Sequence, residues 1–319
     1  VALGLGPGDR LWTSPITFVA SANCGRYCGA EVDFVDIDAR TYNLSVAALA
    51  EKLERAERHG TLPKVVVPVD FAGQSCELAA IRALADRYGF RILEDASHAI
   101  GGTYRGEPTG SGRYSDITVF SFHPVKIITT GEGGMALTQD AELAASMQRL
   151  RSHGITRDEG RMERPNEGAW YYEQMELGWN YRMTDIQAAL GESQLARIDA
   201  YVARRHALAR RYDELLAGLP LVTPWQSPEA HSALHLYPVL VEPAARRKVF
   251  EHLRAAGIGV NVHYIPVHTQ PDYRRLGFAQ GQFPEAERYY SRALSLPIYA
   301  TLSDEQQDRV VAVLREALG

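Results

Sequence analysis

The residues with the clearest capacity for chemistry lie around Lys126, where a short apolar run ends in Ser121 to Lys126 and a glycine-rich stretch, 131–134, follows. A lysine just past a buried strand has a rigid support, and low-dielectric surroundings can lower its pKa so that the neutral amine attacks an aldehyde. The glycines would let the backbone pass close to a flat cofactor. A surface lysine in a glycine-rich hairpin explains this segment equally well when it is considered alone.

Asp95 is the second candidate, because it follows the apolar run 90–93 and Glu94. Such a carboxylate can pair with the pyridinium nitrogen of pyridoxal phosphate (PLP) and keep the ring protonated, so that the ring accepts electrons from a substrate carbanion. An aspartate here is also favoured as an ordinary N-cap of the next helix. Without further context the N-cap is the better explanation.

Three more segments offer groups that could touch a cofactor or a substrate. Phe18 lies in an apolar stretch with interspersed hydroxyl groups and could present its ring to an aromatic face, although such a phenylalanine usually belongs to the core. Asn180 and Arg182 could offer an amide and a guanidinium to a phosphate. His263 and His268 lie five residues apart without an H-E-x-x-H motif, so we expect no metal site there.

The elements that must position these residues are predicted from periodicity. Short apolar runs alternate with helical spacing through the first half of the chain, which is typical of βαβ units and a mostly parallel sheet flanked by helices. We expect strands at 32–35, 65–69, 90–93 and 117–122, and a helix at 78–88 that Gly89 ends. Ligands of such sheets collect outside the carboxyl ends of the strands, so Asp95 and Lys126 should share one edge.

The second half of the chain predicts a smaller domain. Thr184 and Gln187 form a capping-box pattern that opens a long helix reaching Leu215, and the arginines at 204–205 and 210–211 should be its solvated face. After it we expect strands at 235–240 and 259–264, a helix near 244–256 and a final helix capped by Ser303. The predicted domains are 1–200, a large domain, and 201–319, the linking helix with an α+β domain.

Composition excludes several classes of function. The 319 residues are 45% hydrophobic and 23% charged with a net charge of −5, so the chain has no overall electrostatic reason to bind nucleic acid or an anionic membrane. Three cysteines without a C-x-x-C pair fit neither a disulfide framework nor zinc, and they indicate a reducing cytoplasm. No apolar run is long enough to span a membrane. Dinucleotide-binding, P-loop and hydrolase motifs are missing.

In their order along the chain, several segments resemble the DegT/DnrJ-type sugar aminotransferases, a branch of the fold-type I PLP enzymes. The resemblance covers nearly the whole chain, and it rests on the ordered set more than on any one segment. It implies a large, mostly parallel sheet domain with a smaller C-terminal α+β domain. The matching segments are 6–9, 14–20, 34–38, 94–96, 121–126, 131–134, 177–185 and 296–299.

The resemblance implies a PLP cofactor and a role for each matching residue. Lys126 would form the Schiff base, Asp95 would pair with the pyridine nitrogen, and Phe18 would stack on the ring. His98 would lie near the phenolic oxygen of the cofactor, and Ser121 would contact its phosphate. Asn180 is expected to reach the phosphate of the partner subunit's cofactor, because active sites shared across a homodimer are usual in the family.

One departure from the family concerns the phosphate of PLP. Family members carry a Gly-Thr-Ser/Ala segment before the Gly-Pro-Gly-Asp turn, and this segment cradles the phosphate at a helix N-terminus. The sequence as given starts just after that place, at Val1. We therefore expect residues 1–9 to be the tail of a helix running into a turn, and the phosphate end of the site to be incomplete in this chain.

Within the family, 122–126 and 261–268 resemble the transaminases that make UDP-4-amino-4,6-dideoxy-N-acetyl-β-L-altrosamine for pseudaminic acid. The implied reaction transfers an amino group from L-glutamate to a UDP-linked 2-acetamido-2,6-dideoxy-4-keto-hexose. The candidate substrate contacts are Arg182, His263, Tyr264 and His268. Two alternatives remain: a PLP-dependent nucleotide-sugar dehydratase, against which Lys126 argues because that variant carries histidine there, and a non-catalytic regulatory member.

Overall fold

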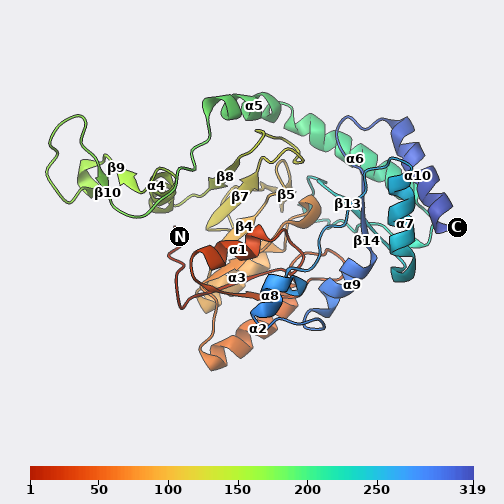
Figure 1. Cartoon of the computed structure of the whole chain (residues 1–319), viewed down its shortest axis with the longest axis horizontal. Helices are drawn as coiled ribbons and strands as arrows, with labels where there is room; N and C mark the ends of the chain where they lie inside the picture. Colours follow the sequence, from red (N-terminus) through yellow and green to blue (C-terminus); the bar gives the residue numbers. More distant parts are fainter.

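The computed structural model describes residues 1–319 and is built around a six-stranded sheet in the order β2-β1-β3-β4-β7-β8 (Figure 1). The first five strands in this order run parallel, and β8 runs antiparallel to β7. The mostly parallel sheet is therefore confirmed. Its strands are β1 (Arg10–Thr13), β2 (Glu31–Phe34), β3 (Val65–Val67), β4 (Arg91–Asp95), β7 (Ile117–Ser121) and β8 (Gly134–Leu137).

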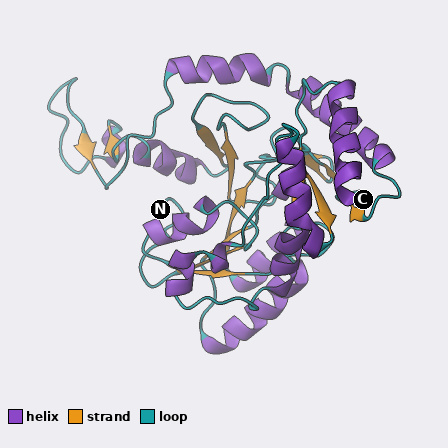
Figure 2. Ribbon diagram, turned by 45° about the vertical axis from the view of Figure 1, so that its right-hand side comes forward, coloured by secondary structure: helices purple, strands orange, loops and turns teal.

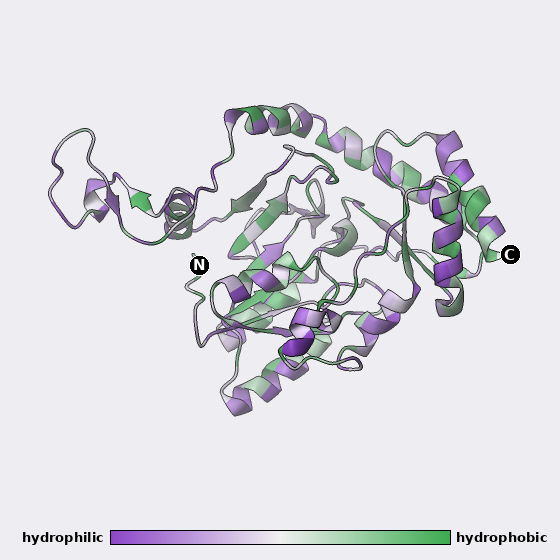
Figure 3. Ribbon diagram, viewed as in Figure 1, coloured by the Kyte–Doolittle hydropathy of each residue, from purple (hydrophilic) through white to green (hydrophobic).

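Alternation along the strands sends side chains to both faces of this sheet. On one face, Trp12, Val66 and Ile92 pack with α2 (Val46–His59) and α3 (Leu78–Tyr88). On the other, Leu11 and Val65 lie with α1 (Ala20–Tyr27) and, at the β8 edge, α4 (Ala141–Leu150). The helices carry hydrophilic and hydrophobic stripes, as Figure 3 shows. Gly89 ends α3 in the left-handed region, φ 79°, as predicted.

The predicted long helix is two helices, α5 (Asp185–Leu195) and α6 (Ile198–Leu215). The Thr184–Gln187 capping box is present, but the chain leaves helical geometry at Arg197, with φ −114° and ψ 8°. The two helices bury different surfaces. Leu208 and Tyr212 of α6 enter the core of the C-terminal half, whereas only Gly191 of α5 is buried.

The C-terminal half packs helices against a small antiparallel sheet, β11-β13-β14. The predicted strand at 259–264 is wrong: only Asn261 makes an isolated bridge, to Ser295. The Asn261 side chain accepts a hydrogen bond from the Val262 amide, which competes with continued strand pairing. The elements are β11 (Leu221–Val222), β13 (Tyr237–Val241), α7 (Pro243–Ala255), α8 (Pro271–Arg275), α9 (Pro284–Arg292), β14 (Ala293–Leu296) and α10 (Asp304–Leu318), which Ser303 caps as predicted.

The two halves are joined by backbone pairing as well as by the chain itself. β12 (Ala230–His231), which follows the predicted boundary, pairs with β5 (Thr103–Tyr104), and β5 also pairs with β6 (Glu107–Pro108). Residues 267–289 pack on Phe34 and Phe71 of the first half in a shared hydrophobic cluster. Short 3-10 helices lie at Phe71–Gly73, Glu159–Arg161 and Val267–Thr269.

An arm with a two-stranded ribbon, β9 (Ile155–Thr156) and β10 (Glu173–Gln174), projects from the body (Figures 1 and 2). Residues 1–9 form turns and contain no helix, so the expected helix tail is not observed. The three cysteines are free. None of the helices has the length and apolar character that crossing a membrane requires.

One prediction about α6 is wrong for Arg205. The arginines at 204–205 and 210–211 were expected on a solvated face, but only 5% of Arg205 is exposed. Its Nη1 donates to the carbonyl oxygens of Leu234, His235 and Ile298, at 3.0, 3.2 and 2.9 Å. The carbonyl groups at the ends of neighbouring segments need a donor here, and the arginine supplies it.

Candidate active site

The loop that carries Lys126 leaves β7 and returns through β8, and backbone bonds hold its base. The Phe122 amide donates to Gly133 at 2.9 Å, and the Thr130 amide donates to Phe122 at 3.0 Å. Gln194 of α5 donates through Nε2 to the Thr129 carbonyl at 2.7 Å. Lys126 is therefore presented by a tethered loop rather than by a free hairpin.

Lys126 lies near Asp95 at the carboxyl ends of β7 and β4. This position was predicted, because ligands of parallel sheets collect at that edge. Burial lowers the pKa of Lys126 below the usual lysine range, and the attraction of Asp95 opposes this shift. A lowered pKa increases the fraction of neutral amine at neutral pH, which is the form that can act as a nucleophile or base.

A hydroxyl group and a backbone amide orient the Asp95 carboxylate. Ser21 Oγ donates to Asp95 Oδ2 at 2.6 Å and lies 2.7 Å from Thr17 Oγ1, and the Ser97 amide donates to Asp95 Oδ1 at 3.1 Å. Ser21 was not predicted from the sequence. Ser21 lies in the first turn of α1, and Thr17 precedes the helix, so their contact depends on the turn that leads into α1.

His98, Tyr264 and Phe18 form an aromatic wall beside these groups. Tyr264 Oη lies 3.1 Å from His98 Nε2, and the Phe18 and Tyr264 ring centroids are 6.4 Å apart. Phe18 is 62% exposed, so it is not a core residue and its ring is free to meet a flat ligand. Burial, with a smaller contribution from Asp95, raises the pKa of Tyr264 above its usual value.

Three histidines around Lys126 are neutral at pH 7. Burial lowers the pKa of His98 and of His235 well below the usual value, and it lowers the pKa of His263 to about 4, with Lys126 contributing to each shift. His263 Nδ1 lies 2.8 Å from Ser295 Oγ. His235 was missed because nothing in its own run, which reads as a strand, indicates the tertiary contact with His98, whose ring centroid is 4.5 Å away.

The structure places the remaining predicted residues outside this cluster. Ser121 ends β7 and its Oγ accepts from the His123 amide at 3.4 Å. Asn180 and Arg182 are exposed on the segment before α5, and no hydrogen bond joins either side chain to the cluster. His268 is not brought to the site: it is fully buried, lies 3.0 Å from a Glu287 oxygen, and packs on Phe283.

The side chains present fit PLP. The cofactor requires an amine for its aldehyde, a carboxylate for its ring nitrogen and flat surfaces for its ring, and Lys126, Asp95 and Phe18 supply these. His98 Nδ1 is buried and has no hydrogen-bond partner within the chain. Because buried polar atoms are seldom unpaired in folded proteins, this atom indicates that a further polar group belongs beside it.

Comparison with known proteins agrees with this geometry. A model of the DegT/DnrJ/EryC1/StrS aminotransferase family matches residues 1–315. GDP-perosamine synthase of Caulobacter vibrioides is 38% identical over 323 residues, which cover 100% of this chain and 81% of that protein. UDP-4-amino-4,6-dideoxy-N-acetyl-β-L-altrosamine transaminase of Campylobacter jejuni is 36% identical over 296 residues, which cover 91% and 74%.

A solved structure extends the comparison to the bound cofactor. The PLP form of the putative sugar aminotransferase Spr1654 from Streptococcus pneumoniae superposes with a TM-score of 0.86 at 30% identity. The match covers 99% of this chain and 82% of that one. The fold is therefore that of the fold-type I PLP enzymes, as the sequence predicted.

Proposed function

Because this chain belongs to the DegT/DnrJ/EryC1/StrS aminotransferase family, and is therefore a PLP-dependent aminotransferase acting on nucleotide sugars, we propose that its acceptor is a UDP-linked 2-acetamido-2,6-dideoxy-4-keto-hexose. L-Glutamate is the proposed donor, and the 4-amino product serves pseudaminic acid synthesis. The observation that carries the proposal is the position of His263 and Tyr264. They belong to the segment 261–268, whose sequence resembles that class of transaminase, and their side chains lie near Lys126 and His98.

Each residue around Lys126 would have a separate role in this amino transfer. When bound, PLP supplies an electron sink that stabilises negative charge on the substrate carbon. Lys126 Nζ would move the proton to and from the substrate carbon as general base and acid. Asp95, held by Ser21, would pair with the ring nitrogen. Phe18 and His98 would hold the ring of the cofactor, and the neutral histidines add no charge that would repel the protonated lysine.

The acceptor is tested with a panel of 4-keto sugars linked to UDP, GDP and dTDP. Each is offered with L-glutamate and PLP, and 2-oxoglutarate is measured. We expect the highest kcat/KM with the N-acetylated UDP sugar. The GDP arm matters because the relative that makes GDP-perosamine is as similar to this chain as the UDP-sugar transaminase is. Turnover of the dTDP or GDP sugar without turnover of the UDP sugar would contradict the proposed acceptor.

We further propose that two copies of the chain form a homodimer through α5 and the neighbouring segment. Large apolar side chains are exposed along α5 and along the segment before it, and within this chain only Gly191 of α5 is buried. Several exposed apolar side chains that gather in one region indicate an interaction surface. The most exposed are Trp170, Leu177, Tyr181 and Ile186 at 72, 81, 74 and 84%. Asn180 and Arg182 lie within this region, so they would face the partner's site.

The dimer is tested by sedimentation of the purified chain. We expect the mass of two copies, and we expect Ile186→Asp to give monomers, because burying an unpaired carboxylate in the interface is costly. Glu192→Gln, on the same helix and also exposed, should leave the dimer intact. A monomeric wild-type chain, or an Ile186→Asp variant that remains dimeric, would contradict the proposed interface.

A further inference from the structure

Two acidic side chains lie in the interior beside the end of β4 that carries Asp95. Glu94 precedes Asp95 on that strand, and Asp70 follows the neighbouring strand β3. Asp70 is fully buried, and only 3% of Glu94 is exposed. A buried carboxyl group is costly unless it is paired, hydrogen-bonded or protonated. The contacts of these two groups therefore decide which of these conditions holds.

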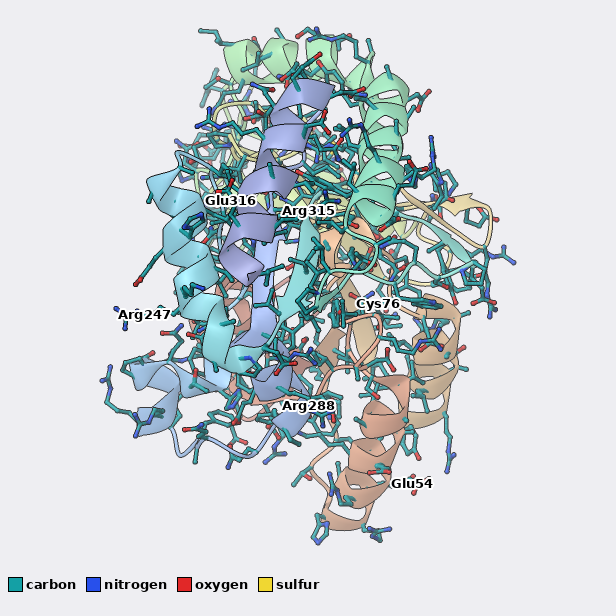
Figure 4. All side chains as sticks on the ribbon, turned by 90° about the vertical axis from the view of Figure 1, so that its right-hand side faces the viewer. Glu54, Cys76, Arg247, Arg288, Arg315 and Glu316 are labelled. Carbon is teal, nitrogen blue, oxygen red and sulfur yellow. The ribbon has the colours of Figure 1, made fainter.

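Each carboxyl group has one oxygen that accepts hydrogen bonds and one that has no partner. Asp70 Oδ1 accepts from the amide of Cys76, which Figure 4 labels, at 2.9 Å. Glu94 Oε2 accepts from Ser115 Oγ at 2.5 Å and from Thr118 Oγ1 at 2.7 Å. Asp70 Oδ2 and Glu94 Oε1 are buried and unpaired. A single proton between these two oxygens would pair both, because a protonated carboxyl group donates a hydrogen bond and an ionised one accepts it.

The charges around the pair favour retention of that proton. Burial and the repulsion of Glu94 raise the pKa of Asp70 well above its usual value, and a hydrogen bond between the two side chains adds to the shift. The amide of Cys76 opposes this shift, and the nearby Asp95 carboxylate supports it. The Cys76 thiol is neutral, because burial raises its pKa as well. Across a small cavity, Glu94 faces Tyr104, Glu107, Arg113 and Tyr114.

The backbone connects this pair to Asp95. The Asp70 amide donates to the Asp95 carbonyl oxygen at 3.0 Å, and the Asp95 amide donates to the Pro68 carbonyl oxygen at 2.9 Å. A bridge between Val69 and Asp95 continues the pairing of β3 with β4 beyond the two strands. Glu94 is the chain neighbour of Asp95. The position of the Asp95 carboxylate therefore depends on how the side chains of Asp70 and Glu94 meet.

We infer that Asp70 and Glu94 share a single proton and that the pair acts as positioning residues for Asp95. The shared proton joins the ends of β3 and β4 where Asp95 leaves the sheet. It also limits the pair to one negative charge, and a second charge so close would disfavour the ionised form of Asp95. The positioning role rests on the proposed function of Asp95, whereas the shared proton depends on neither the acceptor nor the donor.

Amide substitutions test the shared proton, because each supplies one donor in a fixed place. In Asp70→Asn the amide can donate to Glu94 Oε1 while its oxygen accepts from Cys76, and in Glu94→Gln the amide can donate to Asp70 Oδ2. Each single variant should unfold in urea nearly like the wild type at pH 7. In the double variant two NH₂ groups face each other. Its unfolding constant should exceed the product of the single effects by at least about tenfold.

Asp70→Asn also removes a titration. A carboxyl group with a raised folded pKa contributes its full stability below the unfolded pKa, about 4, and loses it as the pH rises toward the folded pKa. From about pH 5 to pH 8, the unfolding constant of the wild type divided by that of Asp70→Asn should rise by up to about tenfold per pH unit. Infrared spectra at pH 7 should show the carbonyl band of a protonated carboxylic acid in the wild type and not in Asp70→Asn.

Asp116 provides the matched control. Its side chain is 9% exposed and accepts from the Ile92 amide of β4 at 2.7 Å, but it pairs with Arg82 and Arg91 at 3.3 and 2.7 Å. Because these cations balance its charge, Asp116→Asn should keep the infrared band. A ratio of unfolding constants that does not change with pH, a wild type without the band, or a double variant whose effects simply add would overturn the shared proton.

The positioning role is tested by titrating the absorbance of PLP with each variant, under conditions where circular dichroism shows it folded. Both single variants should bind PLP within about twofold of the wild type, and the double variant about tenfold more weakly. If the double variant does not fold, Asp70→Ser takes its place, because it has no atom where Oδ2 lies and leaves Glu94 Oε1 unpaired. Wild-type affinity in the folded variant would overturn the positioning role. No measurement here uses an acceptor sugar, so an error in the proposed acceptor would leave these results unchanged.

Discussion

Replacing Lys126 with alanine should reduce amino transfer by roughly 10²- to 10⁴-fold, the range that loss of a positioned acid–base group produces. Lys126 has a lowered pKa and lies near Asp95, and no second lysine is part of this site. The measurement is kcat with saturating keto sugar and glutamate. A second measurement is independent of turnover: after borohydride treatment with PLP, the intact mass of the wild type should rise by one cofactor, and that of Lys126→Ala should not.

Lys52→Met is the matched control for that result. Burial also lowers the pKa of Lys52, and Lys52 also lies near a carboxylate, Asp33, but it sits at α2 away from the site. This variant should keep both its activity and its covalently trapped cofactor. If Lys126→Ala were still trapped by borohydride at one cofactor per chain, the lysine assignment would be wrong.

Replacing Asp95 with asparagine should lower kcat by about 100-fold, which corresponds to the upper range for one charged hydrogen bond. Asparagine keeps the size of the side chain and can still accept from Ser21, but it carries no negative charge to hold a proton on the ring nitrogen. The affinity for PLP, measured by titration of cofactor absorbance, should fall as well.

Ser21→Ala separates charge from orientation in that experiment. It removes the 2.6 Å hydrogen bond to Asp95 and leaves the carboxylate charged, so its loss in kcat should be about tenfold or less. Equal losses in Asp95→Asn and Ser21→Ala would mean that Asp95 acts only through its geometry.

The sheet and its functional edge were predictable because they depend on local patterns. Apolar runs predicted the parallel strands β2, β3, β4 and β7, whereas β1 was not predicted. The polar residues after β4 and β7 placed Asp95 and Lys126 together. Capping boxes at Thr184 and Ser303 were found for the same reason, since each depends on residues only three apart.

The errors arose where distant contacts override local preference. Arg205 has the sequence context of a solvated helix face, yet carbonyl groups about thirty and ninety residues away draw it into the interior. His235 and Ser21 join the site only through partners far along the chain, His98 and Asp95. The segment 259–264 carries the spacing of a strand but finds a single paired position. No window of neighbouring residues contains this information.

The pairing of β12 with β5 has a mechanical consequence for substrate exchange. Backbone hydrogen bonds join the C-terminal half to the N-terminal half at three separate places. The amides of Arg105, Ala233 and Val267 donate to the carbonyl oxygens of Glu229, Gly73 and Pro15, respectively, at 2.7 to 2.9 Å. A hinge needs a boundary that few contacts cross. A hinge motion of one half relative to the other would have to break these three hydrogen bonds at the same time. Substrate and product must therefore pass through an opening whose width stays nearly constant.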